Sequence, residues 1–345
     1  MHRRRIRTAP LVILALLALL TATTVAASAQ AGGQAGKDVR LSLVAYSTPR
    51  EAYGKLIPAF QKTPDGDGVS FTQSYGASGD QARAVVAGLK ADIVALSLAP
   101  DIDVLVKAGL VDPNWNRQSY RGIVHDSVVV LAVRDGNPKK LKTWDDLLKP
   151  GVSVITPNPF TSGGARWNVM AAYGSWIKLH KTKKQAQAKL LKLFQNVSVQ
   201  DKSARDALNT FLAGKGDVLL TYENEAIAAQ RAGQKIQYVI PRQTILIENP
   251  IAVLKGSENF EKARQFLRFL KTPASQQIFA DYGYRPIVPS VLKANQAKGK
   301  FPVRPGQFTI DEKWLGGWTK VQKEFFDPDT GVMARIERHV GGTTG

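Results

Sequence analysis

The residues best suited to bind a ligand are Ser162, Gly163 and Gly164, in the segment 152–167 (VSVITPNPFTSGGARW). They follow a short apolar run typical of a strand and precede apolar residues at the 3.6-residue spacing of a helix. The first N–H groups of a helix have no intrahelical partner and carry partial positive charge. Two glycines leave those groups open, and Ser162 adds a hydroxyl. The segment therefore predicts an anion site, although a serine before a helix is also a common N-cap.

Three further strand-to-helix turns have the same character. They are Tyr46-Ser47 with Thr48-Pro49-Arg50-Glu51, Gly76-Ala77-Ser78-Gly79, and Lys202-Ser203-Ala204. The first has the spacing of a capping box, with proline at the first helical position. In open α/β sheets, ligands gather where strands end and helices begin. We expect the four turns to surround one anion without a cationic side chain, although Ser78 and Ser203 taken singly would be helix caps.

The chain alternates between strand and helix patterns, which predicts an α/β fold with mostly parallel pairing. The stretches 88–94 and 214–219 each end a helix and begin a strand in similar sequence, so two similar lobes are expected. The chain should cross between them near 121–126 and 241–249. The predicted first lobe is 38–122 with about 245–300, and the predicted second lobe is 123–244. The segment 301–345 should pack on the lobes, with a loose tail after His339.

Residues 1–29 have the pattern of an export signal. Four arginines among residues 3–7 precede the apolar run Leu11–Leu20, and Ala27-Ser28-Ala29 has the small residues of a cleavage site. The apolar run is short of the ~20 residues that span a bilayer. We expect cleavage after Ala29 and a periplasmic or other extracytoplasmic location, with an uncleaved anchor as the alternative. Residues 30–37 are expected to be disordered.

The composition restricts the classes of partner and site. The chain has no cysteine, which excludes disulfides and cysteine metal sites. Residues 1–29 contain four of the 47 Lys and Arg residues and none of the 28 Asp and Glu residues, so the remainder has a net charge of +15. Such a surface attracts anions, nucleic acid or anionic lipid. The basic runs 178–192 and 293–300 lack interleaved aromatic residues, so we interpret them as solvated faces and expect no nucleic-acid partner.

Catalytic patterns are scarce. His125 is the one histidine near a predicted crossing, and a single histidine is more often structural than catalytic. The segment Gly76–Asp80 resembles a nucleophile elbow but lacks its final glycine. Asp92, Asp101 and Asp103 lie near the ends of predicted strands but lack metal-ligand spacing. We therefore expect no enzyme activity, no cofactor and no metal; a hydrolase of sulfate or phosphate esters is one alternative, and a basic exported protein that binds nucleic acid or envelope polymers is another.

Several segments, in the same order, resemble the periplasmic sulfate-binding proteins of ABC importers. They are 75–86 (YGASGDQARAVV), 137–138 (NP), 144–147 (WDDL), 150–167, 222–226 (YENEA) and 308–318 (FTIDEKWLGGW). The resemblance covers most of residues 39–335. It implies an α/β, two-lobed, type II periplasmic-binding-protein fold, each lobe a mixed sheet flanked by helices. It also implies a monomer that closes over sulfate and delivers it to a membrane permease.

The resemblance also implies a set of ligand-binding residues. Carried over position by position, the family pattern points to Ser78, Ser162, Gly163, Gly164 and Ala204. Ser162 would use its hydroxyl, and the glycines and Ala204 their N–H groups. Two further positions depart from the pattern: Ser47 stands where the family has an aspartate that offers its N–H, and Tyr222 where the family has a tryptophan indole donor. A tyrosine hydroxyl also donates, with a different reach, so the choice between sulfate and thiosulfate stays open.

The residue types at these positions favour sulfate over phosphate. Sulfate carries no proton at neutral pH, so every group around it should donate, whereas phosphate is better recognised with a carboxylate acceptor. No Asp or Glu occupies a proposed contact position, although Asp80 and Glu223 are neighbours that could turn inward. Charge-assisted hydrogen bonds contribute about 1.5–3 kcal/mol each. Several of them, from both lobes, are needed to offset the dehydration of a dianion, so closure is expected.

Overall fold

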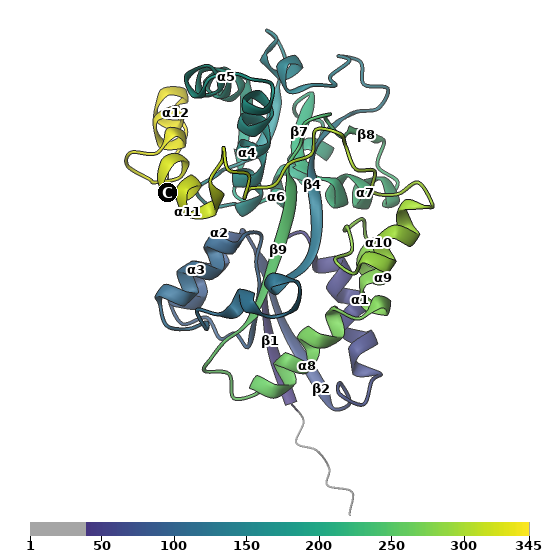
Figure 1. Cartoon of the computed structure of the whole chain (residues 1–345). Coiled ribbons are helices and arrows are strands. Elements are labelled where there is room, and N and C mark those ends of the chain that lie inside the picture. Colours follow the sequence, from purple (N-terminus) through teal and green to yellow (C-terminus); the bar gives the residue numbers. More distant parts are fainter. Residues whose placement is uncertain (1–38, 345) are drawn as a thin grey trace, which may run out of the picture. The chain divides into compact units, whose positions relative to one another are not determined.

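The computed structural model describes residues 39–344, so the predicted signal (1–29) and lead-in (30–37) lie outside it. The described strands pair in the order β2-β1-β3-β9-β4-β7-β5-β6, and β8 pairs with β4 (Figure 1). They are β1 (Val39–Tyr46), β2 (Val69–Gly76), β3 (Ile93–Ala95), β4 (Ile123–Arg134), β5 (Val154–Pro157), β6 (Val197–Asp201), β7 (Val218–Tyr222), β8 (Ile236–Val239) and β9 (Leu246–Val253).

Most helices alternate with these strands up to β9, and the remaining helices follow one another to the C-terminus. They are α1 (Arg50–Gln61), α2 (Ser78–Val86), α3 (Ala99–Lys107), α4 (Gly163–Lys178), α5 (Lys183–Gln195), α6 (Ala204–Leu212), α7 (Glu223–Arg231), α8 (Phe260–Leu270), α9 (Pro273–Asp281), α10 (Pro289–Gln296), α11 (Gly317–Phe325) and α12 (Val332–Val340). Short 3₁₀ segments are η1 (Trp115–Arg117), η2 (Ser119–Gly122) and η3 (Trp144–Leu148).

The pairing divides the sheet into two parts that are joined by two long strands. In one part β1 pairs in parallel with β2 and β3, and in the other β5 pairs in parallel with β6 and β7. The strands β4 and β9 pair with each other in antiparallel fashion, and they continue into opposite parts, where β9 pairs with β3 and β4 pairs with β7. Both parts are therefore mixed, as the resemblance implied. The mostly parallel pairing predicted from the alternation of strands and helices is wrong, because β4 and β9 run antiparallel to the strands they pair with. The chain crosses between the two parts where β4 and β9 pair.

The hydrophobic core is divided in the same way. Two clusters of buried side chains gather around β1, β3, α1, α3 and α8, and two gather around β5, β7, α4, α5 and α6. Figure 1 shows α1, α2, α3 and α8 beside the first part and α4, α5, α6 and α7 beside the second. The chain thus has the predicted two-lobed α/β fold. We call the part with β1–β3 the first lobe and the part with β5–β7 the second; their predicted residue limits remain a proposal.

The helix α4 lies at the centre of the second lobe. Trp167 on α4 belongs to the same buried cluster as Phe308, Phe325 and Met333 of the C-terminal segment. The helix is therefore covered on nearly all sides, which explains why its apolar residues are not confined to one stripe. A Cβ on Gly174 would lie 2.5 Å from the ring of Phe308, so glycine permits this close packing.

The prediction of a capping box before α1 is wrong. The helix begins at Arg50 with Pro49 as its N-cap, and no side chain caps it. The Thr48 hydroxyl instead shares a hydrogen bond of 3.0 Å with the hydroxyl of Tyr284. A partner distant in sequence has replaced the local one, which sequence spacing could not reveal.

The tail after His339 is held in part, in contrast to the expectation that it is loose. Asn158 donates from Nδ2 to the carbonyl of Thr343 over 3.0 Å, and the Gly342 N–H donates to the carbonyl of Glu337 over 2.8 Å. The tail therefore contacts the turn between β5 and α4.

Candidate anion-binding site

Helix α4 begins at Gly163, directly after the turn that follows β5. Asn158 holds this turn, because its Oδ1 accepts the Phe160 N–H over 2.7 Å and its carbonyl accepts the Ser162 N–H over 2.9 Å. Ser162 is 3% exposed, and its side chain makes no capping bond. Since the first N–H groups of a helix lack intrahelical partners, this helix start offers a ligand the N–H groups of Gly163 and Gly164 and the Ser162 hydroxyl.

Helix α6 begins at Ala204, beside the start of α4. Its N-cap Ser203 is a true cap, because the hydroxyl accepts the Asp206 N–H over 3.2 Å. The N–H of Ala204 is then the group that this helix start offers a ligand. A Cβ on Gly164 would lie 3.4 Å from the Cβ of Ala204 and 3.5 Å from the ring of Tyr222. The starts of α4 and α6 and the end of β7 therefore meet at one place in the second lobe.

The first lobe reaches the same place through the residues that follow β3. A Cβ on Gly163 would collide with Leu98 Cδ2 and would lie 2.7 Å from the Cβ of Ser97. Ser97 Oγ lies 2.6 Å from Tyr222 Oη, and Ser97 also accepts the indole N–H of Trp167 at its carbonyl over 2.9 Å. The two lobes are thus in direct contact here, and the contact requires glycine at position 163.

Ser78, at the start of α2, uses its hydroxyl inside the first lobe. The hydroxyl donates to Asp101 Oδ2 over 2.5 Å and accepts the Ser97 N–H over 2.9 Å. The next residue, Gly79, donates its N–H to the carbonyl of Thr161 in the second lobe over 3.1 Å. The start of α2 therefore offers a ligand the N–H of Ser78 rather than its hydroxyl, which instead orients Ser97.

Tyr222 ends β7 with its side chain 1% exposed. Burial raises the pKa of the Tyr222 hydroxyl well above its usual range, and the hydrogen bond with Ser97 opposes this shift only in part. The hydroxyl therefore keeps its proton and remains a neutral donor. The ring centroid of Tyr46, at the end of β1, lies 6.3 Å from that of Tyr222.

Ser97 is a candidate site residue that the sequence analysis did not name. It is 1% exposed and contacts both lobes through its hydroxyl, N–H and carbonyl. The signal was present in the sequence, because Ser97 follows the apolar run 93–96 and precedes Pro100 in the first turn of α3. That is the same strand–hydroxyl–helix pattern found at the other turns.

Ser47 is joined to this group through its neighbours in the chain. It is buried and follows Tyr46, whose ring lies near that of Tyr222. The carbonyl of Thr48 accepts a hydrogen bond of 3.3 Å from Arg205. Because α1 begins only at Arg50, Ser47 precedes the helix by three positions and does not lie in its first turn.

Cations near the helix starts join the two lobes. Arg205, in the first turn of α6, contacts Glu51 of α1 at 2.6 Å and Glu225 of α7 at 2.9 Å. Arg166 of α4 donates to the carbonyl of Pro159 over 2.8 Å and lies 3.9 Å from Asp101 of α3. Arg205 and Arg166 are thus bound by protein groups and support the turns.

The neighbouring carboxylates are also bound by protein groups. Glu223 pairs with Arg285 at 2.7 Å, and both side chains are buried. Asp80 pairs with Arg83 and lies 3.0 Å from Lys202. Neither carboxylate has turned inward as a separate acceptor, although Asp101 does accept from the Ser78 hydroxyl.

His125 is structural in its contacts. Its ring lies 4.1 Å from that of Tyr284 and 4.7 Å from that of Phe279, measured between centroids. Burial lowers the pKa of His125 to about 3, so the ring is neutral.

Within residues 39–344, no group of three or more His, Cys, Asp or Glu side chains is placed to hold a metal. In the same part of the chain, no helix has the length and apolar character to cross a membrane.

Comparison with known proteins identifies the family. A profile described as "Bacterial extracellular solute-binding protein" matches residues 41–285. The chain belongs to this family. The sulfate-binding protein of Synechococcus elongatus is 42% identical over 339 residues, which cover 94% of this chain and 96% of the relative. The thiosulfate-binding protein of Pseudomonas aeruginosa is 37% identical, with 92% and 98% covered.

A solved structure agrees with this assignment. The sulfate-binding protein SubI from Mycobacterium tuberculosis H37Rv is 43% identical and superposes with a TM-score of 0.80, covering 84% of this chain and 100% of SubI. The resemblance to sulfate-binding proteins and the periplasmic-binding-protein fold, both expected from the sequence, are therefore confirmed.

Proposed function

We propose that this solute-binding protein captures sulfate between its two lobes and delivers it to an ABC importer. The observation that carries the proposal is the meeting of three helix starts with a neutral Tyr222–Ser97 pair at one place. The proposed binding group, which we call the helix-start site, consists of Ser47, Ser78, Ser97, Ser162, Gly163, Gly164, Ala204 and Tyr222. The relatives of this chain that are named sulfate- and thiosulfate-binding proteins support a sulfate-like anion as the ligand.

The donors in this site suit a fully deprotonated anion. Backbone N–H groups at helix starts, the Ser162 hydroxyl and the Tyr222 hydroxyl can all donate, and none carries a charge. The helix dipoles of α2, α4 and α6 add partial positive charge at their N-terminal ends. Phosphate, which keeps a proton part of the time, would need an acceptor, and the nearby Glu223 and Asp80 are already held in ion pairs.

The two lobes must close over the anion, because the donors are divided between them. The first lobe supplies Ser78 and the second supplies Gly163, Gly164 and Ala204, so neither lobe alone provides enough hydrogen bonds to replace the hydration shell of a dianion. The hydrogen bonds of Gly79 with Thr161 and of Ser97 with Tyr222 join the two lobes and would stabilise the closed arrangement. Release to a permease then requires these interlobe contacts to open.

Calorimetry on the chain without residues 1–29 tests the proposal. Sulfate should bind with one site per chain, thiosulfate is the near alternative, and phosphate should bind far more weakly. Absence of sulfate and thiosulfate binding would reject the proposal.

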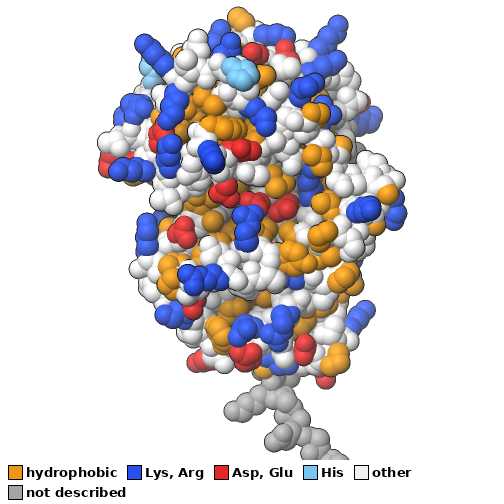
Figure 2. Space-filling view, in the orientation of Figure 1, with side chains coloured by type: hydrophobic (Ala, Val, Ile, Leu, Met, Phe, Trp, Pro, Cys, Tyr) orange, Lys and Arg blue, Asp and Glu red, His pale blue; other side chains and the backbone are white. Residues whose placement is uncertain are grey.

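A DNA-shift assay on the same sample tests the nucleic-acid alternative. Lys and Arg side chains are spread over the visible face among acidic ones, rather than gathered in one stripe (Figure 2), and this distribution does not favour nucleic-acid binding.

The remaining parts of the proposal concern location and partners. A family of extracellular solute-binding proteins works outside the cytoplasm. We propose export by the signal in residues 1–29 with cleavage after Ala29, action as a monomer, no catalytic turnover and a membrane permease as the receiving partner. Mass spectrometry of the exported protein tests the cleavage, and its elution volume tests the monomer.

A further inference from the structure

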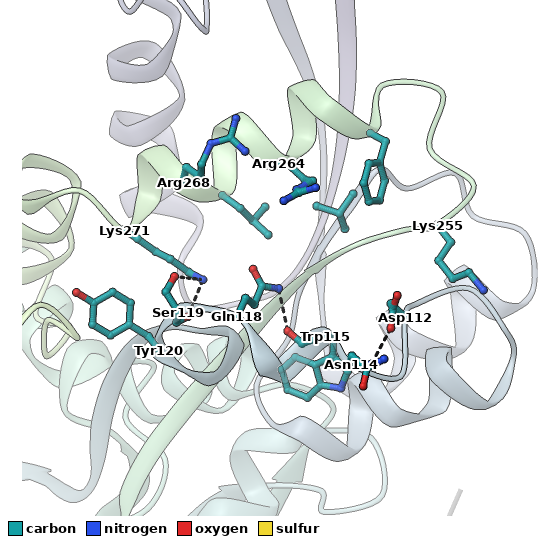
Figure 3. Close-up of a pocket in the computed structure, with 13 residues that line it drawn as sticks. Asp112, Asn114, Trp115, Gln118, Ser119, Tyr120, Lys255, Arg264, Arg268 and Lys271 are labelled. Carbon is teal, nitrogen blue, oxygen red and sulfur yellow. Dashed lines mark hydrogen bonds between the residues drawn. The ribbon is translucent and has the colours of Figure 1, made fainter.

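A second recess lies in the first lobe, apart from the residues of the helix-start site. It is a cavity of about 640 Å³ between α8 and the segment 112–120 (Figure 3). Arg264 and Arg268 of α8 and Lys271 just after it line one side, and Trp115, Gln118 and Ser119 come from the opposite side. We call this cavity the basic pocket; it is also lined by Asp112, Asn114, Tyr120, Val253, Lys255, Phe260 and Leu267.

The helix period explains the basic side. Positions 264, 268 and 271 are separated by four and three residues, so they lie on one face of α8, and Lys255 adds a fourth cation. Asp112 is the one acidic residue among those that line the pocket, and its Oδ1 accepts the Asn114 N–H over 2.7 Å. The lining therefore has an excess of three positive charges.

These cations are poorly neutralised by the protein itself. Among residues 39–344, Arg264 has one carboxylate within 4.0 Å, Glu261 at 3.7 Å, and Arg268, Lys255 and Lys271 have none. Lys271 instead donates to the carbonyl of Ser119 over 2.9 Å, and burial lowers the pKa of its ammonium group. A group of positive charges with few counter-charges attracts anions.

The pocket also has apolar lining residues, beside the polar Asn114, Gln118 and Ser119. Val253, Leu267 and the buried ring of Trp115 lie beside the cations. At the rim, Tyr120 is 40% exposed and Phe260 is 37% exposed. Tyr120 and the next residue, Arg121, both have left-handed backbone, with φ of 56° and 54°, a conformation that is costly for residues other than glycine.

We propose that the basic pocket is a second ligand site, which takes an amphipathic organic anion with a flat apolar body and two or more negative groups. The apolar body would lie against Trp115, Tyr120 and Phe260, and the anionic groups would pair with Arg264, Arg268 and Lys271. The site is independent of the sulfate proposal, because it shares no residue with the helix-start site.

The size of the pocket decides between kinds of occupant. A cavity of about 640 Å³ lies within the usual range for small-molecule sites, about 300–1,000 Å³. Sulfate alone would fill only a small part of it and would leave the apolar surface wet. A stable protein partner would need an interface of roughly 1,000 Å² or more, much of it beyond this recess.

The test uses pyrenetetrasulfonate, a fluorescent anion whose sulfonates do not titrate near neutral pH. Anisotropy titration should give saturable binding with one site per chain. The double variant Arg264→Gln/Arg268→Gln should weaken this binding at least tenfold and leave sulfate affinity by calorimetry within twofold. The matched control Lys293→Gln/Lys298→Gln removes two exposed cations from α10 and its end, and should change dye affinity less than twofold.

Three results would overturn the proposal. One is equal weakening by both double variants, which would mean attraction to net charge alone. Another is displacement of the dye by stoichiometric sulfate, which would place the dye in the helix-start site. The third is undiminished dye binding in Tyr120→Ser/Phe260→Ser, which would show that the apolar rim contributes nothing. The first and third results do not bear on whether sulfate binds, so failure of this proposal remains distinguishable from failure of the sulfate proposal.

Discussion

The helix-start site and the basic pocket would hold anions by opposite means. The first is built from backbone N–H groups and two hydroxyls, and its cations Arg166 and Arg205 are bound by protein carboxylates and carbonyls. The second directs weakly paired cations at a partly apolar recess. The first joins two lobes, whereas the second lies within one lobe.

This difference has consequences for selectivity and release. Neutral donors in fixed positions distinguish anions by protonation and shape, because each donor needs an acceptor lone pair at the correct place. Cations on flexible side chains attract any anion. In the basic pocket, selectivity would therefore come mainly from contacts between the apolar lining residues and the apolar body of the ligand. A site that spans two lobes can also be opened by lobe motion, as transport requires, and a site within one lobe cannot.

The largest effect is expected from Gly163→Asp. The new side chain would collide with Leu98 and place a negative charge at the start of α4. Loss of two charge-assisted bonds alone corresponds to about 100-fold or more in affinity. Sulfate calorimetry should show at least this loss, with dye binding in the basic pocket unchanged. Gly54→Asp, where a side chain meets open space on α1, is the control; retained sulfate affinity in Gly163→Asp would contradict the site.

Tyr222→Phe should have the next largest effect. It removes one neutral donor from the helix-start site without changing the size of the ring. A hydrogen bond to a charged group is worth about 1.5–3 kcal/mol, so sulfate affinity should fall roughly 10- to 100-fold in calorimetry. Tyr53→Phe removes a buried hydroxyl that has no hydrogen-bond partner within the described residues, and should leave affinity unchanged. Equal effects of the two variants would remove Tyr222 from the site.

Raising the salt concentration should change the ratio of the two affinities by about fivefold or more. Raising the ionic strength shortens the screening length and weakens attraction to exposed cations, while buried contacts are screened much less. Dye affinity should fall about tenfold or more between low and high NaCl, and sulfate affinity only about twofold. Parallel titrations of the same sample measure both. A sulfate affinity that falls as steeply as the dye affinity would mean that cations hold sulfate.

Ser97→Ala should have a moderate effect. The variant removes the hydroxyl that is 2.6 Å from Tyr222 Oη but leaves the Tyr222 donor in place. A neutral hydrogen bond is worth about 0.5–1.5 kcal/mol, so sulfate affinity should fall about two- to tenfold. Ser70→Ala on the exposed part of β2 is the matched control. If Ser97→Ala weakens binding as much as Tyr222→Phe, Ser97 contacts the anion directly.

The smallest effect should be that of pH on sulfate binding. Backbone N–H groups do not titrate, and burial raises the pKa of Tyr222, so its proton is retained as pH rises. Sulfate affinity should therefore be constant from about pH 6 to 9. In the basic pocket, burial lowers the pKa of Lys271, so this side chain loses its positive charge at a lower pH than an exposed lysine does. As pH rises, dye affinity should therefore fall before sulfate affinity changes. Isothermal titrations across this range check both.

The helix starts were predictable from local patterns, and the partners of their side chains were not. Residues 162–164 follow a strand pattern and precede a helix pattern, so the start of α4 could be read from the sequence. The role of Ser78 could not, because its hydroxyl partner Asp101 lies on another helix. Thr48 has the spacing of a cap and instead contacts Tyr284, which is 236 residues away. Local spacing reports on local bonds only.

The sequence by itself determined most of the elements and the two-lobed α/β class, and it predicted the type of donor, because hydrophobic period, glycine position and hydroxyl placement are local properties. The tertiary structure decided which donors meet, and that Ser97 joins Tyr222, because these contacts depend on how β3, β7 and α4 pack. It also decided that the cations of α8 face Trp115 across a recess. A helix period places side chains on one face, but only packing determines what lies opposite that face.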